Sequence, residues 1–242
     1  MQELRIQKYL SEMGVMSRRA AEAAVNSGRV IINGERAKTG QKVVPEIDEI
    51  LCDGILITRQ SKKEKKMYLM MYKPAGVVTT MSDEHGRFCV GDILKQQNLP
   101  ERVYPVGRLD MYSEGLLILT NDGDAANKLM HPKHEISKIY HATIKGELKR
   151  EIIKKLEKPL EIDGRETTGA KVDVIEQKNG RTKLKIEIFE GRNRQIRRMC
   201  ENCELIILKL KRVCMGNLNI GLLKPGEFKL LNYNEIKYLK NI

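Results

Sequence analysis

The stretch GRLDMYSEGLLILTNDG, residues 107–123, sets an isolated acid beside an apolar run. The segment LLILTNDG is typical of a buried strand that ends in a turn, and the Ser-Glu-Gly at 113–115 predicts a sharp change of direction before it. Asp110 is therefore expected at the rim of a sheet, close to apolar walls. Arg108 stands shortly before it, and on a strand the side chains of residues i and i+2 share a face.

The surroundings predicted for Asp110 suit two different roles. A nearby cation keeps an aspartate ionised, and an apolar wall makes that anion reactive by denying it water. Those conditions favour a nucleophile or a general base. A loop aspartate in a salt bridge is the alternative, and it is the more common of the two. Residue chemistry alone leaves both open.

The composition indicates a polyanionic partner. The chain has 242 residues, with 44 Lys and Arg against 32 Asp and Glu and a formal net charge of +12. RNA, DNA and an anionic membrane are candidate partners, although a basic solvated surface has the same composition. No stretch approaches the roughly 18 apolar residues of a membrane span, and the charged N-terminal segment is unlike a signal peptide. We expect a cytoplasmic protein with no membrane partner.

The cysteines do not predict a metal site. There are five, an odd number that cannot all pair internally. Cys200 and Cys203 form a lone C-x-x-C, with no second pair and no histidine at ligand spacing, whereas a zinc site needs four ligands. Two half-buried thiols are the expected state, and a redox pair is the alternative.

A basic stretch divides the chain into two predicted units. Residues 59–66, RQSKKEKK, hold five basic residues in eight and are the best linker candidate. We expect a small unit over residues 1–60, a linker over 61–67 and a large unit over 68–242.

The small unit is predicted to contain two short helices and a small antiparallel sheet. Apolar residues at helical spacing predict a first helix that Gly14 ends, and Ser17 is suited to cap a second helix. Asn-Gly at 33–34 and Asp-Gly at 53–54 each predict a hairpin turn. Four basic residues are assigned to the remaining helix face, where they either face solvent or contact phosphates: Arg5, Lys8, Arg18 and Arg19.

The large unit is predicted to hold a mixed, mostly antiparallel sheet flanked by helices, which gives the α+β class. MYLMMYKPAGVVTT, residues 67–80, predicts a strand, a loop and a β-rich segment, and the alternation around Asn179-Gly180 predicts a hairpin. Further helices are expected within 89–97, 124–132, 150–160 and 192–203, and further strands within 137–148 and 205–220.

Residues 5–37 resemble a known RNA-binding module, the S-four domain. SRRAA at the start of the second helix and GRVIING at the end of the segment follow the order of that family, and the resemblance extends over residues 4–50. It implies that the small unit anchors structured RNA through phosphates and shape.

Five ordered segments resemble the ribosomal pseudouridine synthases that carry an S-four domain. GRLDMYSEGLLILTNDG is similar to the family's catalytic motif. The other segments keep the family's order across essentially the whole chain, and they are YKPAGVVTT at 72–80, SKIYHATIKG at 137–146, EGRNRQIRRM at 190–199 and LKRVCMGNLNIGLLKPGEFKLL at 210–231.

This second resemblance implies isomerisation of a uridine to pseudouridine in ribosomal RNA, with Asp110 as the catalytic residue. The product is an isomer, so the reaction needs no redox partner, nucleotide or metal, and no cofactor is expected. A carboxylate suits an anomeric carbon that becomes electron-poor, as in glycoside hydrolysis. It can attack that carbon to form a glycosyl ester, or remove a ribose proton to give a glycal. The sequence does not choose between the two routes.

The same resemblance implies roles for other residues. Tyr140 would stack on the flipped uracil, although its alternating pattern alone favours a core tyrosine. Arg197 would pair with Asp110 and fix its rotamer, and Arg108 would fill the gap left by the flipped base. The remaining mapped cations are expected to contact RNA: Lys73, Arg192, Arg194 and Arg198.

Two other classes of protein fit parts of the sequence. A non-catalytic RNA-binding protein of ribosome assembly explains the charge and residues 1–60, but not Asp110, Tyr140 and the 190–199 segment in one chain. An RNA glycosidase or nuclease is the other class, but a nuclease would want a metal cluster or paired histidines, and the four histidines are not arranged for either. The HPKHEISK segment at 131–138 favours large-subunit over small-subunit ribosomal RNA as the partner. We expect a monomer.

Overall fold

The structure, a computed structural model, divides the chain into two units and describes residues 3–58 and 65–242. The first unit is Met1–Lys66 and the second is Met67–Ile242, and each has a hydrophobic core of its own. The predicted linker covers this boundary, but its residues 61–64 lie outside the described residues. None of the helices in the described ranges is long and apolar enough to cross a membrane.

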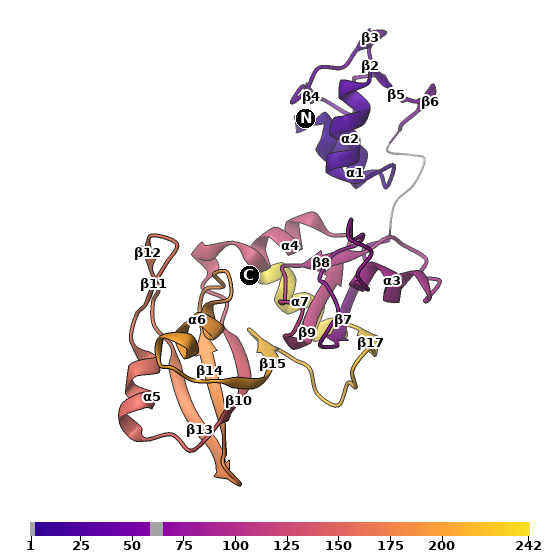
Figure 1. Ribbon diagram of the computed structural model, residues 1–242. Coiled ribbons are helices and arrows are strands. Elements are labelled where there is room, and N and C mark those ends of the chain that lie inside the picture. The colour runs from indigo at the N-terminus through magenta and orange to yellow at the C-terminus, as the bar shows by residue number, and fades with distance from the viewer. Residues whose placement is uncertain (1–2, 59–64) are drawn as a thin grey trace. The chain divides into compact units, whose positions relative to one another are not determined.

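The described residues of the first unit form two helices and two small sheets (Figure 1). The Ser17 side chain caps the second helix by accepting a hydrogen bond from the Ala20 amide at 3.2 Å. Asn33 and Gly34 both have positive φ, as a two-residue hairpin turn requires. The elements are β1 (Leu4–Arg5), α1 (Ile6–Glu12), α2 (Arg18–Asn26), β2 (Val30–Ile32), β3 (Glu35–Arg36), β4 (Lys42–Val43), β5 (Ile50–Cys52) and β6 (Ile55–Leu56).

The four basic residues predicted to share a helix face are placed in different ways. Arg18 and Arg19 are exposed on the first turn of α2. Arg5 is exposed but belongs to β1, because its pairing with β4 takes it out of the first helix. Lys8 is half-buried on α1 and forms an ion pair with Glu12 at 3.4 Å.

The second unit is built on one sheet whose main path runs β13-β14-β10-β15-β9-β7-β17, with β16 beside β15 and β8 beside β9. Its pairs are antiparallel except β9–β15, so the predicted mixed, mostly antiparallel sheet is confirmed. The strands are β7 (Tyr68–Lys73), β8 (Tyr104–Val106), β9 (Glu114–Thr120), β10 (Lys138–Lys145), β13 (Lys171–Lys178), β14 (Arg181–Ile188), β15 (Ile207–Met215), β16 (Leu218–Asn219) and β17 (Phe228–Leu230).

Helices cover both faces of the inner strands β7 and β9. Helices α4 (Gly123–Met130) and α7 (Tyr233–Asn241) pack on one face with residues such as Met70. Helix α3 (Val90–Lys95) packs on the other face with residues such as Met71. Burial from both sides explains why these strands have unbroken apolar runs instead of an alternating pattern.

The outer strands bury one face against two further helices, α5 (Arg150–Glu157) and α6 (Gln195–Asn202) (Figure 1). Residues such as Ala142, Leu184 and Leu210 form that core. The alternating burial of β14 follows from this one-sided packing. A short hairpin of β11 (Glu161–Ile162) and β12 (Arg165–Glu166) and a 3₁₀ turn at Pro132–His134 complete the unit.

The predicted β-rich segment at 77–80 is wrong. It forms a single bridge between Val78 and Cys89, and the chain then enters a loop. The hydroxyl groups of Thr79 and Thr80 donate hydrogen bonds to loop carbonyls. These bonds satisfy polar groups of the segment that have no strand partner.

Strands β9 and β15 meet through a short parallel seam of two residue pairs, Glu114–Lys211 and Gly115–Arg212. Gly115 has a φ of +104°, and a Cβ placed there would lie 2.2 Å from the Arg212 carbonyl oxygen. A larger residue therefore does not fit. The glycine that predicted a change of direction serves instead to let two strands come close, and this seam joins the inner strands to the outer ones.

Candidate active site

A cavity of about 460 Å³ lies beside the seam, and its size is within the range of about 300–1,000 Å³ typical of ligand pockets. Its walls are the loop at 107–113 and the segment at 191–197. Its floor is formed by alternate residues of three neighbouring strands, which are Lys138, Tyr140, Ile188, Leu210 and Arg212. The structure thus brings Asp110, Tyr140 and Arg197 to one cavity.

Asp110 lies in a loop and not on a strand. Strand β8 ends at Val106, and Gly107 then takes a φ of +73°. The Ser113 amide donates to the Asp110 carbonyl at 3.0 Å and closes a turn. The same-face argument for Arg108 therefore does not hold, and Arg108 is an exposed residue at the cavity. The Asp110 side chain is 34% exposed and open to a substrate.

Arg197 is the cation that faces Asp110. Its Nε lies 3.5 Å from Asp110 Oδ2. Its Nη2 donates to the Tyr112 carbonyl at 3.0 Å and to the Ser113 hydroxyl at 3.3 Å. The guanidinium is therefore tied to the loop that carries the carboxylate, and it approaches from α6. Such a charged contact favours one orientation of the aspartate.

Lys73 was predicted to contact RNA, and the structure places it inside the protein. Its side chain is fully buried, and Nζ donates to the carbonyls of Pro74 and Val77 at 2.7 Å each and of Met111 at 3.3 Å. Burial lowers the pKa of Lys73 to about 8, while the charge of Asp110 acts in the opposite direction. Lys73 is thus a buried support behind the Asp110 loop.

Thr79 is a supporting residue that the sequence did not single out. Its hydroxyl donates to the Leu109 carbonyl at 2.7 Å and accepts from the Leu109 amide at 3.2 Å. The Gly76 amide donates to the Met111 carbonyl at 2.7 Å. The backbone on both sides of Asp110 is therefore bonded to the segment that follows β7.

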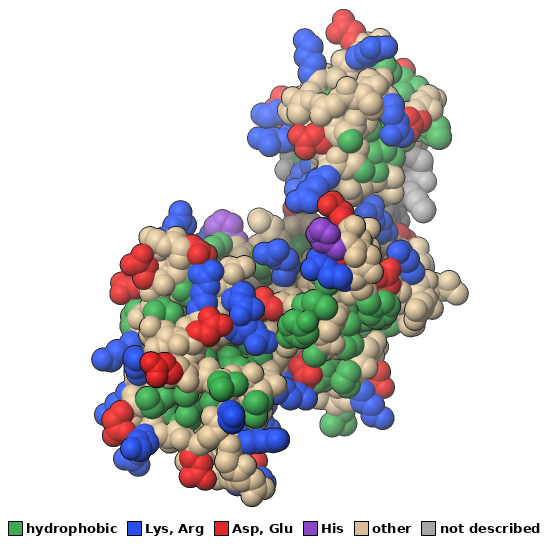
Figure 2. All heavy atoms as spheres, viewed as in Figure 1, with side chains coloured by type: hydrophobic (Ala, Val, Ile, Leu, Met, Phe, Trp, Pro, Cys, Tyr) green, Lys and Arg blue, Asp and Glu red, His purple; other side chains and the backbone are tan. Residues whose placement is uncertain are grey.

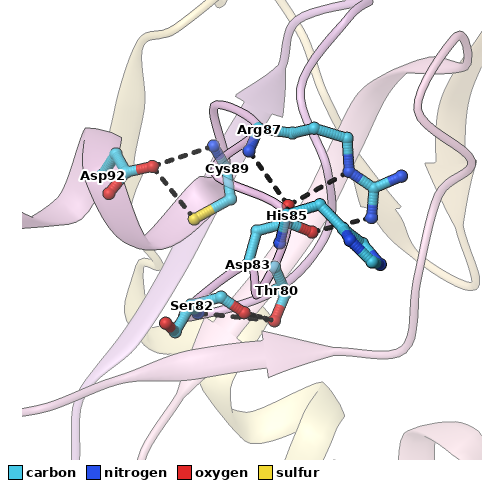
Figure 3. A network of polar contacts seen from close by, with 7 residues as sticks. All are labelled: Thr80, Ser82, Asp83, His85, Arg87, Cys89 and Asp92. Atoms are coloured by element: carbon cyan, nitrogen blue, oxygen red, sulfur yellow. Dashed lines mark hydrogen bonds and ion pairs between the residues drawn. The ribbon is translucent and has the colours of Figure 1, made fainter.

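The loop after Thr79 is organised by a second aspartate, Asp83 (Figure 3). Its carboxylate accepts hydrogen bonds from Nε and Nη2 of Arg87 at 3.1 and 2.8 Å, and from the amides of Arg87 and His85 at 3.0 and 3.2 Å. The Arg87 side-chain and backbone bonds hold the pKa of Asp83 well below its usual range. At the end of the loop, Asp92 caps α3 by accepting from the Cys89 amide at 3.1 Å.

Tyr140 is half-buried on β10, where it packs against the core under α5 and α6 and also lines the cavity. Its neighbours across the sheet are Ile186 and Arg212. The ring therefore combines the core position favoured by its pattern with a face that a base can reach.

Two buried cations in the floor escaped the sequence analysis. Lys138 Nζ donates to the Ile136 carbonyl at 2.7 Å, and burial lowers the pKa of Lys138 to about 8. Arg212 Nε donates to the Leu116 carbonyl at 2.8 Å. Lys138 is two residues from Tyr140, and Arg212 is two residues from Leu210. Because alternate residues of a strand share a face, this spacing was the signal that could have identified both cations.

Arg192 was predicted to meet phosphates, but its hydrogen bonds are made within the protein. Its Nε donates to Glu190 at 2.9 Å. Its Nη1 and Nη2 donate to carbonyls of the β11–β12 hairpin, at Ile162, Arg165 and Glu166. Arg192 thus fixes that hairpin to the cavity wall and has little capacity left for RNA.

Arg194 and Arg198 lie at the surface. Arg194 is exposed and pairs with Glu201 at 3.2 Å, and Arg198 is half-buried and pairs with Asp163 at 2.8 Å. Their partners are exposed, so these pairs exchange readily with solvent or phosphate. Figure 2 shows that Lys and Arg side chains are spread over the visible surface of both units, between acidic ones.

The cysteines are free thiols. Cys200 and Cys203 are both buried, and burial raises the pKa of Cys200 to about 12. Because the thiolate is the reactive form, these two residues are poor redox groups. Within the described residues, no group of three or more His, Cys, Asp or Glu side chains is placed to hold a metal ion.

Comparison with known families matches both units. Residues 67–202 match the RNA pseudouridylate synthase family, and residues 4–50 match the S4 domain. The chain is 41% identical over 239 residues to a Bacillus subtilis protein named ribosomal large subunit pseudouridine synthase B, covering 98% of this chain and 95% of that one. A protein of the same name from Buchnera aphidicola is 38% identical over 98% of this chain and 94% of its own length.

A solved structure shows a similar fold. A crystal structure described as a pseudouridylate synthase aligns with a TM-score of 0.68 and 28% sequence identity. The alignment covers 98% of this chain and 99% of the solved one. The similarity therefore extends through both units and the residues that form the cavity.

Proposed function

The chain belongs to the RNA pseudouridylate synthase family, and from this premise we propose that it isomerises a uridine of large-subunit ribosomal RNA, with Asp110 as the attacking carboxylate. The observation that carries this assignment is the Asp110–Arg197 ion pair in the wall of the cavity that Tyr140 lines. The large-subunit target rests on the names of the Bacillus and Buchnera relatives.

The reaction breaks the bond between ribose C1′ and uracil N1 and joins C1′ to uracil C5. As N1 leaves, C1′ becomes electron-poor, and a carboxylate held beside it can form a glycosyl ester. The alternative is that the carboxylate removes the C2′ proton and gives a glycal. The exposure of Asp110 and its long contact with Arg197 suit both routes, because each needs a carboxylate oxygen that is free to approach the ribose.

Arg197 is proposed to hold Asp110 in its productive rotamer. It bonds the Tyr112 carbonyl and the Ser113 hydroxyl, so its guanidinium moves with the loop that carries the carboxylate. Arg198 faces Asp163 instead, and only one of the two adjacent arginines serves the site. The charged contact orients the carboxylate.

Tyr140 is proposed to stack on the uracil once the nucleotide has left its helix. Base-modifying enzymes must unstack their target base, which costs free energy, and stacking on an aromatic side chain offsets part of that cost. Tyr140 lies on the floor, whereas the exposed Arg108 lies at the wall. Arg108 is therefore proposed to take the space that the flipped base leaves in the RNA.

The first unit is proposed to anchor the ribosomal RNA. Its match to the S4 domain and the exposed Arg5, Arg18 and Arg19 support contacts with phosphates. Arg194 and Arg198 would add contacts near the cavity. We also propose that the enzyme is a monomer and that it acts in the cytoplasm, where ribosomal RNA is modified.

The test is pseudouridine mapping of ribosomal RNA from cells that lack the gene, complemented with wild type or with Asp110→Asn. We expect one large-subunit pseudouridine to disappear, to return with wild type and to stay absent with Asp110→Asn. A full return with Asp110→Asn would contradict the catalytic assignment. Loss of a small-subunit site instead would correct the target. No change at any site would favour the non-catalytic RNA-binding protein that the composition also allows.

A further inference from the structure

Arg212 carries a buried nitrogen for which the described residues offer no partner. The side chain is 4% exposed, and its Nε donates a hydrogen bond to the Leu116 carbonyl at 2.8 Å. Its Nη2 is buried and makes no hydrogen bond within the described part of the chain. A buried N–H without an acceptor is costly, more so on a charged group. Arg212 is also one of the residues that line the cavity, which is the side from which an acceptor would approach.

The floor around Arg212 holds an excess of positive charge. Lys138 is 8% exposed and lines the cavity from the next strand. The nearby carboxylates have partners of their own, because Glu114 accepts from the Tyr72 hydroxyl at 2.6 Å and pairs with Lys209 at 2.9 Å. A ligand that carries or develops negative charge would balance this floor.

The depth of Arg212 indicates which part of a nucleotide it meets. The phosphates of a flipped nucleotide stay with the RNA strand at the protein surface, whereas the base enters furthest. Arg212 is nearly fully buried and pairs across the sheet with Tyr140, the residue proposed to stack on the base. A uracil lying on Tyr140 would bring a ring carbonyl within reach of the same floor.

We propose that Arg212 donates through Nη2 to a carbonyl oxygen of the flipped uracil and stabilises the negative charge that forms there when the base detaches. The inference rests on the proposed isomerisation. The electron pair of the C1′–N1 bond leaves with N1 and spreads onto O2 and O4, while Asp110 supplies the electrons that C1′ lacks. C5 then bonds to C1′, the carboxylate is released, C5 loses its proton and N1 gains one, so the product is an isomer. Lys138 adds to the positive field from β10.

The experiment compares Arg212→Lys with wild type on two RNA substrates that differ only at the target, uridine or 5-fluorouridine. A lysine keeps one cation for the Leu116 carbonyl and lacks the unpartnered second nitrogen. Fluorine withdraws electrons and stabilises the detached base by itself. Loss of the target nucleoside is followed at saturating enzyme, and RNA affinity is measured separately. Arg181→Met, an exposed arginine at the tip of the β13–β14 hairpin, is the matched control.

With uridine we expect Arg212→Lys to lose on the order of 100-fold in rate, as is usual when one donor to a developing charge is removed. With 5-fluorouridine the loss should be markedly smaller, and affinity and Tm should stay near wild type. An equal loss on both substrates would overturn the proposal and assign Arg212 a structural role. A loss of affinity with the rate retained would overturn it in favour of phosphate binding. If wild type itself converts no uridine, the proposed function fails first.

Discussion

Asp83 and Asp110 each face an arginine, but the two pairs are built in opposite ways. The Asp83 side chain is 6% exposed and accepts four hydrogen bonds from Arg87 and the loop backbone (Figure 3). The Asp110 side chain is 34% exposed, and its ion pair with Arg197 spans 3.5 Å. Both oxygens of Asp83 are engaged by hydrogen bonds, whereas Asp110 keeps the capacity to act on another molecule.

The difference lies in where the hydrogen bonds go. Around Asp110 the supporting bonds are made by the backbone on either side and by Arg197, as in the bonds from Thr79 to Leu109 and from Arg197 to Tyr112. These bonds position the carboxylate without occupying its oxygen atoms. A reagent and a structural clamp can therefore share the same residue types and differ in how fully the carboxylate is bonded.

The largest expected effect separates the two aspartates directly. Asp110→Asn should lower the single-turnover rate of pseudouridine formation by at least about 1,000-fold, because an amide cannot supply the anion. Asp83→Asn should leave that rate near wild type. Rates are measured on a fragment of ribosomal RNA that contains the mapped site. If Asp83→Asn proved as inactive as Asp110→Asn, the distinction between the pairs would be lost.

The second-largest expected effect is a difference in rate between variants of the two arginine partners, Arg197 and Arg87. Arg197→Met removes the cation that orients Asp110, and we expect a rate loss of about 100-fold. Arg197→Lys should recover part of it, since one charge remains near the carboxylate. Arg87→Met is the matched control and should keep the wild-type rate. A wild-type rate for Arg197→Met at saturating RNA would show that Asp110 is oriented by its own loop alone.

For the stability of the fold, we expect the Asp83 pair to matter more than the Asp110 pair. The bonds to Asp83 hold its pKa below the unfolded value of about 3.9. Ionised Asp83 therefore stabilises the fold above that pH, and the contribution is lost as the pH falls towards the folded pKa. We expect Asp83→Asn to lower the Tm at pH 7 and the difference from wild type to shrink in acid. Asp173→Asn, whose carboxylate is exposed, is the control and should leave the Tm unchanged. A Tm difference that is as large at pH 2 as at pH 7 would contradict this account.

The smallest effect concerns Lys73, which stands behind Asp110. The pKa of Lys73 is about 8 in the fold against an ordinary value of 10.5. Between those values the unfolded chain binds more protons, so the free energy of unfolding should rise with pH. Lys73→Met should reduce that rise, measured by urea unfolding at a series of pH values. Asp110→Asn should move its onset to lower pH, because the Asp110 charge raises the pKa of Lys73. An unchanged pH slope in Lys73→Met would contradict the burial of this cation.

Local signals predicted most of the elements. Asn-Gly at 33–34 and at 179–180 both form hairpin turns, and Ser17 caps α2. Each of these features is decided by residues a few positions apart, so the sequence contains the whole cause. The mixed sheet followed from the order of such elements, with α3 to α6 close to their predicted places.

The sequence could not give the burial of single cations. Lys211 and Arg212 are adjacent on β15, yet the first packs over the Tyr72 ring and the second is buried beneath the cavity. Which of them turns inward depends on the register with β9, a strand far away in the chain. Lys73 was assigned to RNA for the same reason, since the carbonyls that surround it are brought together only by the fold.

The two aspartates show the same limit. Asp83 and Arg87 stand four residues apart, so their pairing is local. Asp110 and Arg197 lie in different motifs, and nothing between them signals contact. Resemblance to a family suggested that pair, and the fold supplies its geometry. The loop at 107–110 was mistaken for a strand because the turn that ends it depends on a backbone bond from Ser113.

The seam between β9 and β15 also sets the order in which a growing chain becomes an enzyme. Arg212 bonds the Leu116 carbonyl across 96 residues of sequence. During synthesis the S4 domain leaves the ribosome before Asp110, and Asp110 leaves before the strands that form the floor of the cavity. The cavity closes only after β15 has emerged. A chain that stops before Ile207 therefore has the S4 domain and Asp110 but lacks the strand that completes the cavity.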